Sequence, residues 1–119
     1  MYSVAVFLDY ANISLASKSN NCVIDYGSLL DYLANEDEKR SLICATAYVP
    51  IDPRKQHAMD AVIESLWSDG YMVETKLGTI CEESYKFDLN VQIAIDVLRT
   101  FYENKPDIIV IASGNGDFL

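Results

Sequence analysis

The sequence predicts an α/β fold in which a mostly parallel central sheet of about four strands is covered by helices on both faces. Two observations support this prediction. Short apolar segments rich in β-branched residues alternate with longer segments that have helical spacing. The chain has 119 residues, which is the length of one domain spanning residues 1–119. Because strands joined by a helical crossover pair in parallel, the alternation indicates three layers.

The first half of the chain is predicted to contain two strands and a helix. Residues 3–9 (SVAVFLD) and 41–49 (SLICATAYV) are apolar along most of their length, which is typical of strands buried on both faces. Residues 25–34 (DYGSLLDYLA) have a helical pattern, and Asp25 is a suitable N-cap.

The next helix and strand follow directly. Residues 52–70 are predicted to form a helix that begins at an Asp52 cap, has Pro53 in its first turn and ends at Gly70. Residues 71–77 (YMVETKL) alternate between apolar and polar, which favours a strand nearer an edge of the sheet.

The last helix and strand are predicted at residues 84–104 and 107–113. Asn90 interrupts the apolar stripe of this helix, and its two alternative roles are to bond a buried loop backbone or to face a binding crevice. The stripe is predicted to contain Phe87, Asn90, Val91, Ala94, Val97, Leu98 and Phe101. The opposite, solvent-exposed face is predicted to contain Asp88, Gln92, Asp96, Arg99 and Glu103.

Composition narrows the functional class. The formal net charge of −9 disfavours proteins that hold nucleic acid on a broad basic surface, but it permits an acidic pocket containing a divalent cation. Three widely separated cysteines argue against a disulfide framework and favour a reducing cytoplasm. The chain shows neither a basic leader nor an apolar run of about 20 residues, so we expect a cytoplasmic protein without a membrane partner.

Polar side chains follow the first and last predicted strands. Asp9 ends the first strand and Asn12 follows it, while Ser113, Asn115 and Asp117 follow the last. If these strands are adjacent, their carboxyl ends face one crevice, where ligands bind in such sheets. Clusters of oxygen ligands suit Mg²⁺ or Mn²⁺. The alternative is that Asp9 and Asp117 only cap the helices that follow them.

Three segments resemble a known family. VFLDYANI near the start, KFDLNVQIAIDVL in the long helix and VIASGNGDF at the end are similar, in order and spacing, to the motifs of NYN domains, the LabA-like branch of the PIN-type ribonucleases. The resemblance implies a PIN-like three-layer fold. It also implies a further helix and strand, and we expect this chain to lack these C-terminal elements. A second copy of the chain or a protein partner would then cover an exposed sheet edge.

The resemblance implies a divalent-metal site built from four aspartates. Asp9 and Asp117 match two of these positions and are the expected metal ligands, while Asn90 and Asn115 stand at the other two. These four residues form the predicted catalytic group. An amide offers a carbonyl oxygen but no charge, so the resemblance implies Mg²⁺ or Mn²⁺ that is held weakly, with help from substrate phosphates.

Substrate contacts are predicted at five further residues. Asn12 and Lys86 match positions of the family motifs, and Ser113 lies within the last motif. Arg54 and Lys55 stand at the start of a predicted helix on the crevice side, where they would contact phosphate or simply form a solvated first turn. Tyr10 and Tyr48 are candidates for stacking on bases, although eight tyrosines make each a weak candidate.

Two functions remain open. The first is a metal-dependent ribonuclease that cleaves phosphodiester bonds in single-stranded or small structured RNA. The second is an inactive NYN pseudoenzyme that binds RNA or a protein partner as a regulatory module. The absence of GxxxxGK[ST] and GxGxxG motifs disfavours NTPases and dinucleotide enzymes.

Overall fold

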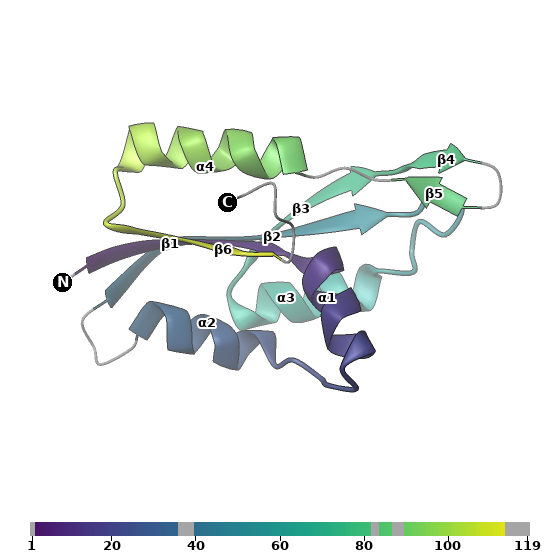
Figure 1. Ribbon diagram of the computed structural model, residues 1–119, viewed down its shortest axis with the longest axis horizontal. Coiled ribbons are helices and arrows are strands. Elements are labelled where there is room, and N and C mark those ends of the chain that lie inside the picture. Colours follow the sequence, from purple (N-terminus) through teal and green to yellow (C-terminus); the bar gives the residue numbers. More distant parts are fainter. Residues whose placement is uncertain (1, 36–39, 82–83, 87–89, 114–119) are drawn as a thin grey trace.

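A four-stranded parallel sheet forms the centre of the protein, as shown by a computed structural model (Figure 1). Its strands are β1 (Tyr2–Asp9), β2 (Arg40–Ile51), β3 (Met72–Leu77) and β6 (Ile108–Ala112), in the order β3-β2-β1-β6. The predicted parallel sheet is therefore confirmed, with residues 71–77 at an edge as expected. The structure describes residues 2–35, 40–81, 84–86 and 90–113.

Helices cover both faces of the sheet, which confirms the predicted three-layer fold. Helix α4 (Asn90–Asn104) lies on one face, and α2 (Tyr26–Asn35) and α3 (Asp60–Asp69) lie on the other (Figure 1). Helix α1 (Tyr10–Ser19) stands at the carboxyl end of β1 (Figure 1). Within the described residues, no helix combines the length and apolar character required to cross a membrane.

Strand β1 is apolar on both sides because it contributes to two separate cores. Leu8 belongs to the same buried cluster as Leu30 of α2 and Leu66 of α3. The neighbouring Phe7 points to the opposite face and belongs to a cluster with Ile93 of α4. Successive side chains of a strand point to opposite faces, so the central strand joins the two layers of helices.

Helix α3 is shorter than predicted because its expected first turns form a separate turn. It begins at Asp60, whereas Asp52 accepts hydrogen bonds from the backbone N–H of Arg54 at 2.9 Å and, through its carbonyl, from that of Lys55 at 2.9 Å. The cap predicted at Asp52 thus closes a turn eight positions before the helix. The predicted end is confirmed, since Gly70 terminates α3 with φ 110°.

The sequence pattern missed three elements. Residues 84–86 were predicted to be helical, but they form β5 (Ser84–Lys86), which pairs antiparallel with β4 (Thr79–Cys81). Lys86 therefore lies on a strand and not one helical turn before Asn90. Helix α1 was missed because its helical pattern is weak: none of its residues is fully buried, although Tyr10 and Ile13 pack against the core.

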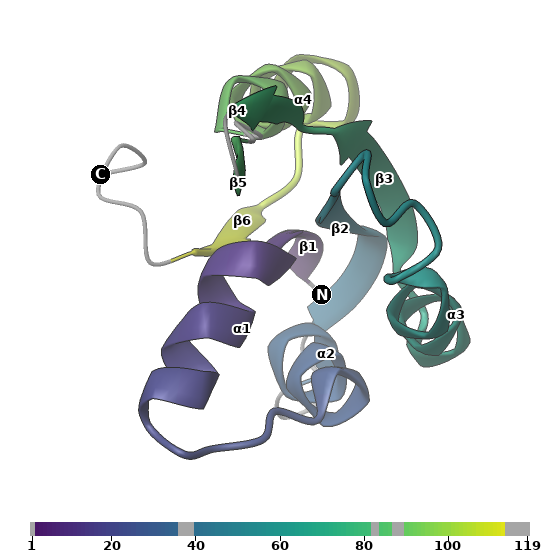
Figure 2. The same ribbon diagram turned by 90° about the vertical axis from the view of Figure 1, so that its right-hand side faces the viewer.

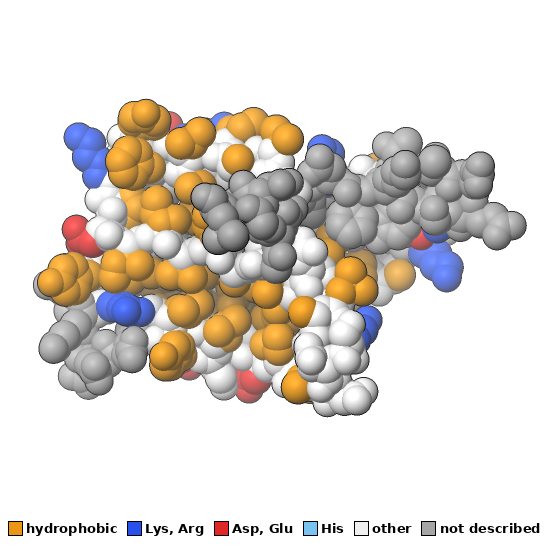
Figure 3. All heavy atoms as spheres, viewed as in Figure 1, with side chains coloured by type: hydrophobic (Ala, Val, Ile, Leu, Met, Phe, Trp, Pro, Cys, Tyr) orange, Lys and Arg blue, Asp and Glu red, His pale blue; other side chains and the backbone are white. Residues whose placement is uncertain are grey.

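The orientation predicted for α4 is wrong. Ile93 is its buried residue, whereas Val91, Leu98 and Phe101 of the predicted apolar stripe are 61%, 57% and 51% exposed. Asp96 was predicted to face solvent, but its side chain is 17% exposed and accepts a hydrogen bond from Tyr48. Apolar side chains consequently gather on the outer surface of α4 (Figure 3).

Candidate functional site at the carboxyl ends of β1 and β6

Asp9 is the centre of the candidate site. It is the last residue of β1, and only 2% of it is exposed to solvent. One carboxylate oxygen accepts a hydrogen bond from the backbone N–H of Asn12 at 3.5 Å, so Asp9 also caps α1. The other oxygen accepts hydrogen bonds from the Asn12 side-chain amide and from Ser113 Oγ, the latter at 3.2 Å.

The pairing of β1 with β6 brings these residues together although they are 104 positions apart in the sequence. Leu8 is in register with Ala112, so Asp9 and Ser113 leave the sheet at the same level. The condition on which the predicted crevice depended, adjacency of the first and last strands, is thus met, and it brings Ser113 to Asp9. Asn115 and Asp117 lie outside the described residues, and their proximity to Asp9 stays a prediction.

The environment of the Asp9 carboxylate is unusual for a buried acid. Within the described residues it forms no ion pair, and its partners are an amide, a backbone N–H and a hydroxyl. Buried charges in proteins are normally paired with an opposite charge or coordinate a metal ion. A carboxylate in this position is therefore suited to receive a cation from solution.

A second buried polar contact lies beside Asp9 in the sheet. Tyr48 is in register with Asp9 on β2, and its hydroxyl donates a 2.7 Å hydrogen bond to Asp96 Oδ2 of α4. Gln92 Nε2 donates to the other oxygen of Asp96 at 2.9 Å, and Arg99 Nη1 lies 3.9 Å from that oxygen. Tyr48 therefore links the sheet to α4 through a carboxylate that the sequence pattern assigned to the surface.

Burial fixes the chemistry of Tyr48. Removal of the ring from water, and then the hydrogen bond and charge of Asp96, raise the pKa of the Tyr48 hydroxyl well above its ordinary value. The hydroxyl consequently remains a donor. Because Tyr48 is fully buried, the suggestion that its ring stacks on bases is wrong. The burial of Tyr48 could have been inferred from the apolar run around it in β2. No feature of the sequence indicated its hydrogen bond to Asp96.

The remaining predicted residues have different surroundings. Asn90 is the first residue of α4 and is half-buried, while the side chain of Lys86 lies outside the described part of the chain. Arg54 forms an ion pair of 2.9 Å with Asp52, and Lys55 is exposed in the same turn. The roles assigned to these four candidates, Asn90, Lys86, Arg54 and Lys55, stay predictions.

Oxygen donors dominate the candidate site. The side chains of Asp9, Asn12 and Ser113 supply carboxylate, amide and hydroxyl oxygens at one edge of the sheet, where α1 meets the end of β6 (Figure 2). Mg²⁺ prefers oxygen ligands and commonly uses only one or two carboxylates. No group of three or more His, Cys, Asp or Glu side chains that could hold a metal occurs among the described residues. The donor set thus fits a weakly held hard cation.

Comparison with known proteins identifies the family. The sequence profile of the NYN domain matches residues 3–119. This chain belongs to the NYN domain family. NYN domains are RNA-associated and fall within the PIN-like nuclease superfamily, whose members generally use divalent metal ions.

The chain is also similar to one protein in sequence and to another in structure. It is 33% identical to the low amplitude and bright protein LabA of Synechococcus elongatus over 123 residues, an alignment that covers 97% of this chain and 63% of LabA. A crystal structure of VPA0982 from Vibrio parahaemolyticus, a protein of unknown function, has the same fold, with a TM-score of 0.76 and 21% identity. That comparison covers 98% of this chain and 69% of VPA0982.

Proposed function

We propose that this NYN domain is a metal-dependent ribonuclease that hydrolyses phosphodiester bonds in RNA, with Asp9 as the main carboxylate that holds the metal. The observation that carries the proposal is the buried Asp9 carboxylate, which has no cationic partner among the described residues. Its location at the carboxyl ends of parallel strands is where ligands bind in α/β sheets.

The protein's own groups have distinct roles in this proposal. Asp9 and Asp117 hold Mg²⁺ or Mn²⁺, while Asn12 and Ser113 keep the Asp9 carboxylate in place through their hydrogen bonds. When bound, the ion activates a water molecule and offsets the charge of the scissile phosphate. That offset matters here because a protein of net charge −9 would otherwise repel RNA.

Two amides make the proposed site weak. Asn90 and Asn115 stand where the family resemblance implies aspartates, and each can contribute an oxygen without a negative charge. We therefore expect the ion to bind together with RNA, whose phosphates supply the missing charge.

Titration with Mn²⁺ tests the proposal. Wild-type protein, Asp9→Asn and Asp9→Ala would be titrated by calorimetry with and without a non-cleavable RNA analogue. Asp31→Asn is the matched control, because Asp31 is exposed on α2 and the substitution makes the same change of charge. We expect both Asp9 variants to weaken Mn²⁺ binding by about tenfold or more, with Asp31→Asn equal to wild type. Identical, negligible binding in wild type and Asp9→Ala would end the ribonuclease proposal.

The two amides also support a second candidate function, a NYN domain that binds RNA or a protein partner without cleaving RNA. Asn90→Asp combined with Asn115→Asp separates the two functions. A gain in Mn²⁺ affinity together with faster RNA cleavage supports a weakened nuclease. RNA binding without cleavage in either protein, in Mg²⁺ and in Mn²⁺, supports the non-catalytic module.

A further inference from the structure

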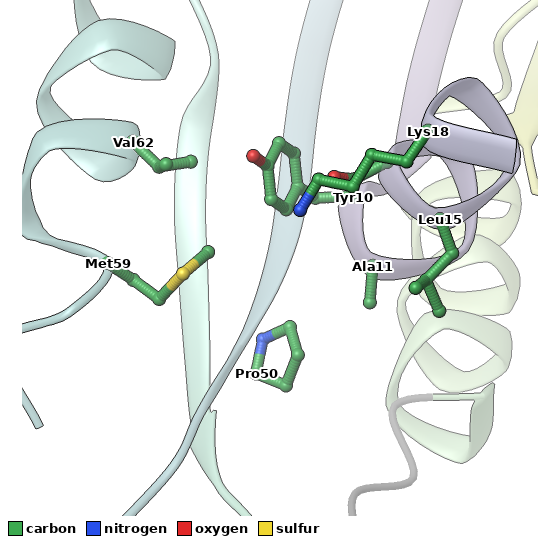
Figure 4. Close-up of a pocket in the computed structure, with 8 residues that line it drawn as sticks. Tyr10, Ala11, Leu15, Lys18, Pro50, Met59 and Val62 are labelled. Carbon is green, nitrogen blue, oxygen red and sulfur yellow. The ribbon is translucent and has the colours of Figure 1, made fainter. Parts of the chain in front are cut away.

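A pocket of about 320 Å³ opens between α1 and α3, next to the end of β2 (Figure 4). Its walls are largely apolar and include Pro50 of β2, Met59 at the start of α3 and Val62 within α3. Tyr10 and Lys18 reach it from α1. Its volume is at the lower end of the roughly 300–1,000 Å³ usual for small-molecule sites, so one ring-bearing group would fill it.

Tyr10 connects this pocket to the candidate metal site. It follows Asp9 directly in the chain, so the two Cα atoms are about 3.8 Å apart. The Tyr10 ring contacts the Tyr26 ring, with centroids 5.5 Å apart and planes at 48°. This contact restricts the Tyr10 side chain before any ligand arrives, which lowers the entropic cost of stacking on it.

Lys18 adds a positive charge to the apolar pocket. In Figure 4 its side chain extends from α1 in the direction of the Tyr10 ring. Lys18 is exposed, and no acidic side chain in the described part of the chain forms an ion pair with it. An ammonium that has no ion-pair partner among the described residues and lies beside an aromatic ring, in a protein of net charge −9, complements a ligand that joins a planar ring to an anion.

We propose that the pocket is a nucleotide subsite that accepts the RNA nucleotide next to the one at Asp9. The base stacks on Tyr10 and contacts Met59, and Lys18 binds its phosphate. This inference rests on the proposed action on RNA, but it does not require the metal ion. Bases of any sequence can stack on an aromatic ring, so the subsite would hold RNA without selecting a sequence.

Methyl NMR provides a direct test. In protein labelled at the methionine methyl groups, Met59 reports on the pocket, and Met72, 67% exposed on β3, serves as the internal reference. The probes are AMP, adenosine and a short single-stranded RNA, each added in EDTA. We expect AMP and the RNA to shift the Met59 signal and leave Met72 unchanged, with adenosine binding more weakly than AMP.

Matched variants assign the effect to the two side chains. Tyr10→Leu keeps apolar volume but removes the ring and should weaken AMP binding by about tenfold, whereas Tyr10→Phe should bind as wild type does. Lys18→Glu should abolish the preference for AMP over adenosine. The controls are Tyr32→Leu on α2 and Lys105→Glu beyond α4, since both residues are exposed and absent from the pocket lining.

Each outcome decides the inference. An unchanged Met59 signal in the presence of AMP and RNA overturns the subsite, and so does equal AMP binding by Tyr10→Leu and wild type. A shift with AMP but none with RNA shows a site for free nucleotides and overturns the RNA assignment. EDTA removes divalent ions, so this experiment tests the subsite independently of the metal. If AMP and RNA shift the Met59 signal but the protein binds no Mn²⁺ in the titration, the subsite is supported and the ribonuclease proposal fails.

Discussion

Removal of one hydroxyl group, in Tyr48→Phe, tests the link between the sheet and α4. The ring stays in the core, so apolar burial is preserved and the hydrogen bond of 2.7 Å to Asp96 is the interaction lost. A hydrogen bond to a charged group contributes roughly 1.5–3 kcal/mol to stability. Asp96 keeps its bond from Gln92 and, with a side chain 17% exposed, can gain a water molecule. We therefore expect a loss of about 1.5 kcal/mol, near the lower limit.

Urea denaturation followed by circular dichroism measures this loss, which corresponds to a decrease of roughly 5 °C in Tm for a domain of this size. Tyr32→Phe is the control, because Tyr32 is 62% exposed, and a surface change of this kind should alter stability by less than about 0.5 kcal/mol. A double-mutant cycle with Asp96→Asn should give a coupling energy of about 1 kcal/mol. If Tyr48→Phe were as stable as Tyr32→Phe, the buried hydrogen bond would contribute nothing to the stability of the fold, contrary to this prediction.

Three further predictions concern the fold. Leu66 is 1% exposed in the core, so Leu66→Ala should lower the free energy of unfolding by about 2–5 kcal/mol in urea denaturation. A loss below about 1 kcal/mol would contradict the burial of Leu66 between α3 and the sheet. Gly70→Ala should cost about 1–2 kcal/mol, because φ is 110° and the new methyl would lie 3.3 Å from Leu30 Cδ2; unchanged stability would refute the left-handed C-cap. Burial, and then nearby charge, raises the pKa of Tyr71 to about 12 from 10.0, and the pKa of Tyr48 is also raised. Since both pKa values are higher in the folded state, stability should be complete below pH 10 and decrease as the pH rises through 12. The difference in absorbance at 295 nm between wild type and Tyr71→Phe should then appear only above pH 10, together with loss of circular dichroism, and a difference that appears near pH 10 would contradict this.

The sheet was predictable because three of its strands contain apolar runs, β3 alternates as an edge strand does, and helical segments separate them. Periodicity of this kind reports burial directly, so β1, β2, β3 and β6 were all located from the sequence. The end of α3 was also predictable, since Gly70 has the left-handed conformation that glycine adopts most easily.

The failures come from two kinds of contact that periodicity does not report, one between distant residues and one within a local turn. The orientation of α4 was wrong because Asp96, polar in any sequence pattern, is held inward by Tyr48, which is 48 positions earlier. The start of α3 was wrong because Asp52 bonds Arg54 within a local turn that competes with a helix. Of the candidate site, the adjacency of Asp9 and Ser113 depends on a strand order that the sequence left conditional. The Tyr10 pocket depends on the placement of α1, for which the suggested cap at Asp9 was the sequence signal.

Helix α1 buries none of its residues, although it contributes Asn12, Tyr10 and Lys18 to the candidate sites. Tyr10 and Ile13 pack against the core only partly buried, so amide exchange in α1 should be faster than in α3 and α4, each of which has a fully buried residue. Mutation of Lys18, which is exposed on this helix, would leave the core intact while changing the proposed nucleotide subsite. Asp9, anchored in the central strand, has no such freedom. Under the two proposals, the residue that holds the metal ion and the residue that stacks on the base are therefore adjacent in the chain but differ in how freely they can change.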